Sequence, residues 1–207
     1  MSREQEVAKS LLKTGAVKLN VKDPFTFVSG IKSPIYCDNR KMIGYPEERQ
    51  VVVEEFVKKL SEKEFDIVAG TATAGIPWAA FIAMAMNKPM SYIRGEKKKH
   101  GAGKQIEGAD VKGKKVVVIE DLISTGGSSI KAVEAAINEG ASQVEVISVF
   151  SYEFEKAFKN FDEKKIKWES LSNFTALLSL AKEEKYLSEE EAEIAASWNK
   201  NTDTWGR

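Results

Sequence analysis

The chain has 207 residues, of which 43% are hydrophobic and 30% are charged, as is typical of a globular protein with one buried core. Its 31 basic and 31 acidic residues cancel, so no global positive field would bind nucleic acid. A single cysteine, Cys37, excludes an internal disulfide and a zinc site of several cysteines. The first residues are charged and no apolar run approaches a membrane span, so we expect a cytoplasmic protein without a membrane partner.

The first half of the chain alternates between helical and strand patterns. Residues 2–14 are predicted to form a helix, because Val7 and Leu11 share one face and Ser2 precedes Gln5 in a capping-box pattern. The next predicted elements are strands at 25–30 and 35–37, a helix at 46–60, a strand at 65–70 and a helix at 76–86. The helix at 76–86 is almost wholly apolar, which predicts burial on most of its sides.

The alternation continues through the second half. The predicted elements are a strand at 90–94, a loop at 95–109, a strand at 115–119, a helix at 128–139, strands at 143–150 and 166–171, and helices at 173–185 and from 188 to beyond Trp198. This order predicts an α/β fold with a mostly parallel sheet between helices. Ligands of such sheets bind at the C-terminal strand ends, so we expect Gly70, Arg94 and Glu120 to converge.

The most informative segment spans residues 116–129. An apolar run leads into Glu120 and Asp121, and residues 124–128 are then only Ser, Thr and Gly. Each feature alone would suit an exposed strand end or an ordinary turn. Together they predict a sugar-phosphate site, because amides at a helix N-terminus bind phosphate while carboxylates bind hydroxyls. The segment has neither the lysine of a Walker motif nor the glycine spacing of a dinucleotide site.

This segment resembles the phosphoribosyl pyrophosphate (PRPP) signature of the type I phosphoribosyltransferases. The resemblance implies that family's fold as one domain over 1–207, with a core at about 46–165 and a small hood made mainly of residues 1–45 plus C-terminal elements. It implies that Mg²⁺ is bound through PRPP and water, without direct protein ligands. It further implies that PRPP is bound by the acid pair, with Asp121 also catalytic, and by the turn: Glu120, Asp121, Leu122, Ile123, Ser124, Thr125, Gly126, Gly127 and Ser128.

A basic, glycine-containing segment lies at residues 94–104. Lysine runs are usually solvated surface, but this one follows a strand end and contains the chain's only histidine. It is similar to the catalytic loop of the orotate branch of the family. The resemblance implies that Arg94, Lys98 and His100 bind PRPP and act in catalysis, with Lys98 the main electrostatic catalyst of pyrophosphate departure. It also implies a homodimer in which this loop reaches the partner's site.

The segment from Phe25 to Asp38 carries a second signature of the orotate branch: aromatic residues, then Ser-Gly, Ser-Pro and another aromatic residue. Taken alone, it would be a hairpin with a Gly/Pro turn. The resemblance implies a hood over the base, with orotate bound by Ile35, Tyr36 and Ser124. Residues 70–77 resemble the pyrophosphate loop of the same family.

Together these resemblances imply transfer of the phosphoribosyl group from PRPP to orotate, giving orotidine 5′-monophosphate and pyrophosphate in pyrimidine biosynthesis. Two alternatives stay open: a purine or xanthine phosphoribosyltransferase of the same fold, and a PRPP- or nucleotide-sensing regulator. The chain has Ser151-Tyr152-Glu153 where many members have Leu-Asp-Arg. The sequence therefore does not identify the group that pairs with the orotate carboxylate.

Overall fold

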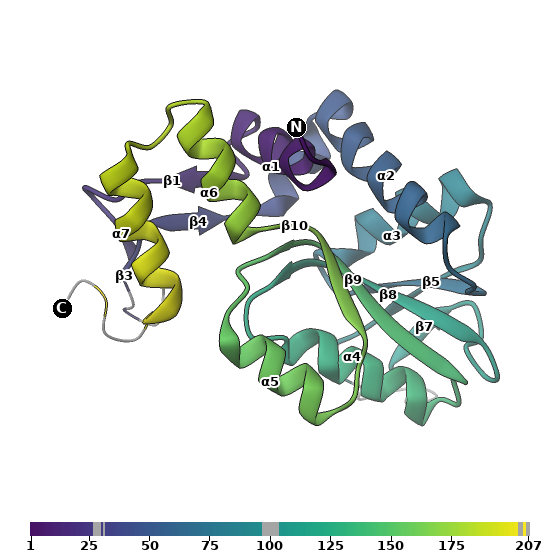
Figure 1. The fold of residues 1–207 in the computed structure, drawn as a ribbon. Coiled ribbons are helices and arrows are strands. Elements are labelled where there is room, and N and C mark those ends of the chain that lie inside the picture. Colours follow the sequence, from purple (N-terminus) through teal and green to yellow (C-terminus); the bar gives the residue numbers. More distant parts are fainter. Residues whose placement is uncertain (27–29, 31, 97–103, 203–204, 206–207) are drawn as a thin grey trace.

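A computed structural model describes residues 1–26, 30, 32–96, 104–202 and 205 (Figure 1). Its central sheet has six strands in the order β10-β9-β8-β5-β6-β7. In chain order these are β5 (Ile67–Thr71), β6 (Met90–Ile93), β7 (Ile106–Gly108), β8 (Lys115–Ile123), β9 (Gln143–Ser151) and β10 (Trp168–Asn173). Every neighbouring pair is parallel except β6 with β7, so the predicted mostly parallel sheet is confirmed.

Helices cover both faces of the sheet (Figure 1). One face carries α2 (Pro46–Ser61) and α3 (Gly75–Met86), and the other carries α4 (Gly127–Asn138) and α5 (Glu155–Glu163). Successive residues of β8 therefore alternate between two cores, because strand side chains alternate between faces. Val117 and Ile119 belong to the core under α3, and Val116 and Val118 to the core under α4. None of the helices within the described part of the chain is long and apolar enough to cross a bilayer.

A smaller assembly lies beside one end of the sheet (Figure 1). Within it β1 pairs antiparallel with β4, and β2 pairs antiparallel with β3. Its elements are α1 (Arg3–Lys13), β1 (Val17–Leu19), β2 (Phe25–Thr26), β3 (Lys32–Ser33), β4 (Ile35–Cys37), the 3-10 helix η1 (Asn39–Gly44), α6 (Phe174–Glu183) and α7 (Glu189–Lys200). The capping box at Ser2 and Gln5 is confirmed. The strand predicted at 25–30 is described only at its start, since residues 27–29 lie outside the described residues.

Two predicted boundaries are wrong. β8 continues to Ile123 instead of ending at Ile119, so the acid pair lies within the strand. It continues because β9 pairs with it along this stretch, with Leu122 opposite Phe150. The predicted loop at 95–109 contains β7, whose pairing with β6 is a long-range contact that no local pattern signals.

Helix α3 is buried on most of its sides, as predicted, and is exposed on one. Met84 is 80% exposed, Ala85 is exposed and Phe81 is only partly buried. The inward side is covered as expected, with Trp78 and Ile82 fully buried. The outer side of α3 thus exposes the apolar side chains of Met84 and Ala85, while the Arg49 guanidinium of α2 lies over the Phe81 ring at 4.8 Å.

Trp198 fixes the C-terminal helix α7 to the rest of the smaller assembly, which we call the hood. Its side chain is fully buried, and its ring lies 5.4 to 5.9 Å from those of Tyr152, Phe154 and Phe174. Its indole Nε1 donates a hydrogen bond to the carbonyl oxygen of Lys32 at 3.1 Å. One side chain therefore joins α7, the residues after β9 and the β2–β3 hairpin.

We expect Trp198→Ala to lower the free energy of unfolding by about 3–5 kcal/mol, because it leaves a cavity among aromatic rings. Trp198→Phe keeps an aromatic ring but loses the bond to Lys32, which adds about 1 kcal/mol to the cost of its smaller volume. Urea unfolding would measure both. Tyr186→Ala, at a residue that is 53% exposed, is the control and should change stability by less than about 0.5 kcal/mol. A loss under about 1 kcal/mol for Trp198→Ala would contradict the anchoring role.

Candidate functional site

The C-terminal ends of β5, β6 and β8 meet at one edge of the sheet, where the strand order reverses. β5 and β8 are neighbours, but the chain leaves β5 into α3 on one face and β8 into α4 on the other. Open α/β sheets bind ligands at such a switch point. Gly70, Arg94 and Glu120 all lie at this edge, as predicted.

Two glycines let the segment between β5 and α3 lie against β8. A Cβ at Gly70 would lie 2.7 Å from the carbonyl oxygen of Gly75, and a Cβ at Gly75 would overlap the carbonyl oxygen of Ile119. Only glycine permits both approaches. Nearby, Thr71 Oγ1 is buried and has no hydrogen-bond partner among the described residues. Such a hydroxyl is a candidate ligand-binding group.

Glu120 is bonded to protein groups. Glu120 is only 4% exposed. Its Oε2 accepts hydrogen bonds from Ser128 Oγ at 3.0 Å and from Ser129 Oγ at 3.1 Å. Oε1 accepts from the backbone N–H of Asp121 at 3.2 Å. Burial raises the pKa of Glu120 to about 7, and the charge of Asp121 adds to the rise. Predicted as a PRPP-binding residue, Glu120 here connects the acid pair to the first turn of α4.

Asp121 is the more accessible of the two acids. It is half-buried, and its backbone carbonyl oxygen accepts a hydrogen bond from Asn39 Nδ2 at 2.6 Å. Burial raises the pKa of the Asp121 carboxyl, while the nearby charge of Arg40 lowers it. Asp121 is therefore the acid that retains access to a ligand.

The turn that follows is held from the α5 side. Gly126 has a φ of +80°, which favours glycine, and a Cβ there would lie 2.6 Å from the ring of Phe161. Asn160 Nδ2 donates to the carbonyl oxygen of Thr125 at 2.8 Å. No described side chain caps α4, so its first N–H groups remain available to an anion. The predicted turn at Ser124 to Ser128 leads directly into the N-terminus of α4, and its binding of phosphate stays a prediction.

Of the three predicted catalytic cations of the basic loop, Arg94 is the one that lies within the described residues. Its N–H donates to the carbonyl oxygen of Gln105 at 3.0 Å, and its own carbonyl accepts from Gln105 Nε2 at 2.8 Å. Its guanidinium lies 4.0 Å from the carboxylate of Glu107, and its side chain is 40% exposed. Lys98 and His100 lie outside the described residues.

The predicted orotate-binding residues differ in their surroundings. Ile35 is fully buried, and its N–H and C=O are both hydrogen-bonded to the hydroxyl of Ser33. Tyr36 is 39% exposed, and its ring lies 5.8 Å from that of Phe25. Ser124 is half-buried in the turn. Of the hood pair, Tyr36 thus offers the accessible side chain.

Sequence reasoning missed three residues that organise this edge: Asn39, Ser129 and Asn160. A signal existed for Ser129, which continues the run of Ser, Thr and Gly. No signal existed for Asn39 and Asn160, because their hydrogen-bond partners lie 82 and 35 positions away in the sequence.

Glu153, which stands where many family members have arginine, accepts hydrogen bonds from the N–H and hydroxyl of Thr175 at the start of α6.

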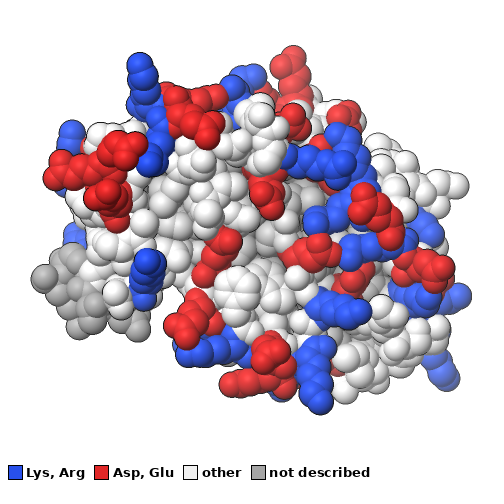
Figure 2. Space-filling model, viewed as in Figure 1, with Lys and Arg blue, Asp and Glu red and all other residues white. Residues whose placement is uncertain are grey.

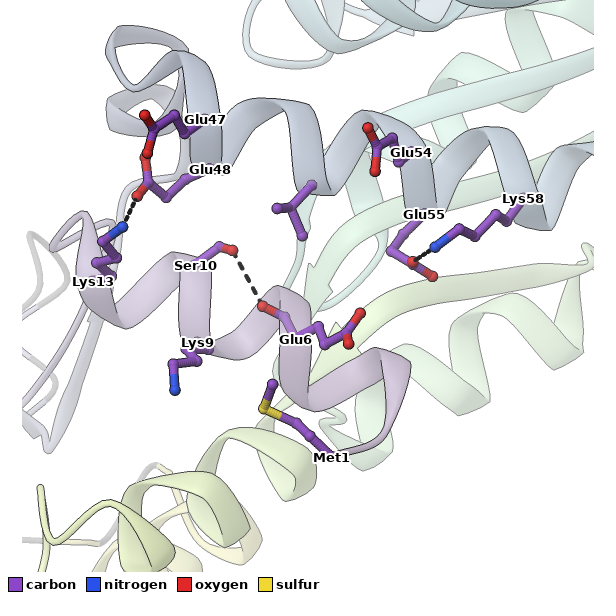
Figure 3. A pocket seen from close by; sticks show the side chains of 11 residues that line it. Met1, Glu6, Lys9, Ser10, Lys13, Glu47, Glu48, Glu54, Glu55 and Lys58 are labelled. Atoms are coloured by element: carbon purple, nitrogen blue, oxygen red, sulfur yellow. Dashed lines mark hydrogen bonds and ion pairs between the residues drawn. The ribbon is translucent and has the colours of Figure 1, made fainter.

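A cavity of about 440 Å³ lies between α1 and α2, away from the strand ends (Figure 3). Two of its acids, Glu48 and Glu55, are paired with Lys13 and Lys58. It contains none of the predicted site residues.

Elsewhere on the surface, acidic and basic side chains are interspersed over the face shown in Figure 2. Among the described residues, no group of three or more His, Cys, Asp or Glu could hold a metal ion.

The phosphoribosyl transferase domain family matches residues 43–181. The chain is 49% identical over 207 residues to the orotate phosphoribosyltransferase of Streptococcus thermophilus, covering 99% of each. It is 47% identical over 209 residues to that of Listeria innocua, covering all of both chains.

Solved structures share the fold. The orotate phosphoribosyltransferase of Aeropyrum pernix aligns with a TM-score of 0.73 and 29% identity, over 88% of this chain and 99% of its own. The Leishmania donovani UMP synthase aligns with a TM-score of 0.79 and 28% identity, over 95% of this chain and 42% of its own. The enzyme of Mycobacterium tuberculosis in complex with PRPP, at 22% identity and a TM-score of 0.68 over 85% of this chain and 99% of its own, supports the fold alone.

The raised pKa of Glu120 predicts how stability depends on pH. The folded protein keeps a proton that the unfolded chain releases above the ordinary pKa of 4.5, so the free energy of unfolding falls as pH rises from there to about 7. We expect Glu120→Gln, which cannot ionise, to lack this fall. Its melting temperature relative to wild type should therefore be higher at pH 8 than at pH 4. Glu193→Gln, at an exposed position of α7, should parallel wild type, and a parallel profile for Glu120→Gln would contradict the assignment.

Proposed function

We infer the roles of these residues from the family to which the chain belongs, the orotate phosphoribosyltransferases of the phosphoribosyl transferase domain family. The chain is an enzyme that transfers the phosphoribosyl group of PRPP to orotate, giving orotidine 5′-monophosphate and pyrophosphate in pyrimidine biosynthesis. The observation that carries the residue roles is the acid pair beside the uncapped N-terminus of α4 at the switch point. Neither a purine acceptor nor a purely regulatory role is favoured by any observation.

PRPP binding divides between the turn and the acids. The N–H groups of residues 124–128 bind the 5′-phosphate, because the N-terminus of α4 has a partial positive charge and unpaired donors. Asp121 accepts hydrogen bonds from the ribose hydroxyls. Glu120 contributes through Ser128, whose hydroxyl it already binds. The segment from Gly70 to Pro77 lies next to them and accommodates the pyrophosphate, with the Thr71 hydroxyl as a donor.

The reaction exchanges two bonds at one carbon. The C1–oxygen bond to pyrophosphate breaks with its electron pair on the leaving oxygen. A ring nitrogen of orotate forms the new bond from the opposite face, and the proton of that nitrogen passes to water or to the leaving pyrophosphate. C1 becomes positive in between, as in glycoside chemistry. The Asp121 carboxylate favours that charge. Arg94, Lys98 and His100 stabilise the negative charge that develops on pyrophosphate.

Mg²⁺ fits the site only as an ion held mainly by PRPP and water. Both oxygens of Glu120 already accept hydrogen bonds from protein groups, which leaves Asp121 as the nearby acid able to contact a hydrated ion. When bound, the ion would neutralise charge on the pyrophosphate.

The base is selected by the hood and the turn. Tyr36 supplies an exposed aromatic side chain and Ser124 a hydroxyl beside the phosphate pocket. The backbone groups of Ile35 are bound by Ser33, so Ile35 contributes by fixing the strand that carries Tyr36.

We further propose that the enzyme is a cytoplasmic homodimer in which the loop at 94–104 acts in the partner's site. The exposed apolar side of α3 supports association, since Met84 is 80% exposed and Tyr45 is 46% exposed near the start of α2. Burial of such a side against a second copy would remove apolar surface from water.

Turnover with a panel of bases tests the reaction. We expect orotate with PRPP and Mg²⁺ to give orotidine 5′-monophosphate, and hypoxanthine, adenine and uracil to react at least about a hundredfold more slowly. The reaction of each base would be measured by the rate at which pyrophosphate is released. Rapid turnover of a purine without turnover of orotate would overturn the choice of substrate.

Lys98→Ala tests the role of the loop. We expect kcat to fall by about 10²–10³-fold with a smaller change in KM for PRPP, because the interaction strengthens as charge develops on the leaving group. Lys97→Ala is the neighbouring control with the same loss of charge, and it should retain most activity. Equal effects of the two substitutions would contradict a specific role for Lys98.

Mixing Lys98→Ala with Asp121→Ala subunits tests whether the site is shared. A loop that acts across the interface gives mixed dimers with one intact site, so activity should return towards half of wild type in those dimers. If the mixture has only the summed activity of the separate Lys98→Ala and Asp121→Ala proteins, a shared site is contradicted.

A further inference from the structure

We propose that Asn39 is a positioning residue that sets the orientation of Asp121 for ribose binding and so couples the hood to the sugar site. The proposal rests on the role of Asp121 proposed above and adds a residue to it. Asn39 is the first residue of η1, two positions after Cys37 at the end of strand β4, and is fully buried. Its Nδ2 donates to the Asp121 carbonyl oxygen at 2.6 Å across 82 positions of sequence.

The hydrogen bond from Asn39 lies on the side of β8 that faces β5, beyond the point where β5 ends. The Lys115 carbonyl accepts from Asp66 N–H on the β5 side of β8, and Asp121, six residues later, directs its carbonyl to that same side. The pairing of β5 with β8 ends at Ile119. Asn39 thus supplies the hydrogen bond that a longer β5 would have supplied, and it does so at the acid itself.

The amide of Asn39 is fixed in one orientation. Cys37 Sγ donates to Asn39 Oδ1 at 3.2 Å, which leaves Nδ2 directed at Asp121. Burial raises the pKa of the Cys37 thiol well above its usual range, and the charges of Asp121 and Asp38 raise it further, so the thiol remains a donor. A chain of two hydrogen bonds therefore runs from β4, the strand that carries Tyr36, to the acid pair.

The test separates positioning from support of the fold. Asn39→Ala removes the donor, and Asn39→Asp keeps the size but places acceptors against the Asp121 carbonyl. We expect both to lower kcat/KM for PRPP by about 10–100-fold, since a small displacement of a catalytic group has effects of this size. Asn199→Ala is the matched control, because Asn199 Nδ2 also donates to a backbone carbonyl oxygen, that of Tyr152, at 2.5 Å, and makes no hydrogen bond to either acid. It should lose a comparable amount of thermal stability and keep kcat/KM within about twofold.

A double-mutant cycle with Asp121→Asn provides the readout that a structural role would not change. If Asn39 acts through Asp121, Asn39→Ala should cost less than about threefold in the Asp121→Asn background. Equal losses in both backgrounds would overturn the proposal while leaving the role of Asp121 intact. An unchanged kcat/KM for Asp121→Asn alone would instead refute the proposed ribose-binding role, and the positioning role with it.

Cys37 gives an independent check. Cys37→Ser retains a donor to Asn39 Oδ1 and should stay within about twofold of wild type in kcat/KM for PRPP. Cys37→Ala removes the donor and should reproduce part of the Asn39→Ala loss. Equal activity of the two Cys37 variants would show that the orientation of the amide does not depend on the thiol and would overturn that step.

Discussion

The last residue of β8 that pairs with β5 is Ile119, yet β8 remains a strand to Ile123 because β9 pairs with it along its whole length. Four residues thus extend beyond β5 with one side of the backbone open. The side chain of Asn39 and the tightly turned segment ending at Gly75 occupy that side. The acid pair is consequently bordered by the hood on one hand and by the start of α3 on the other. A shorter β8 would have left the acids in a loop with no such framework.

Under the proposed function the same extension creates an electrostatic difficulty, because two neighbouring carboxyls lie beside the helix N-terminus that binds phosphate. Burial raises the pKa of both carboxyls, and the charge of Asp121 adds to the rise for Glu120, whose pKa is about 7, so the pair carries less negative charge near neutral pH. The two serine hydroxyls that bond Glu120 also tie that carboxyl to the start of α4. The helix dipole therefore faces less opposing charge, and the N-terminus of α4 can still attract phosphate.

The sequence predicted the parts of this arrangement that depend on neighbouring residues. The apolar run of β8, the glycine turn and the capping box at Ser2 are each set within a few positions, and each was found. The missed features depend on partners far away in the chain. β8 is prolonged by β9, β7 forms by pairing with β6, and Asn39 finds its acceptor 82 positions away. The apolar composition of α3 indicated burial on most sides without indicating that the exposed side would be the one carrying Met84.

The three residues at the end of β9 that differ from the family pattern, Ser151, Tyr152 and Glu153, contact the hood or each other. Glu153 bonds Thr175 at the start of α6, Tyr152 packs in the aromatic cluster around Trp198, and Ser151 Oγ accepts from the N–H of Glu153. An arginine at position 153 could not accept those bonds, because its guanidinium has only donors. The three residues that depart from the family pattern thus assemble α6 and α7 against the hood. Under the proposed function, recognition of the base then depends on the hood strand bearing Tyr36 and on Ser124, and Asn39 connects that strand to the sugar site.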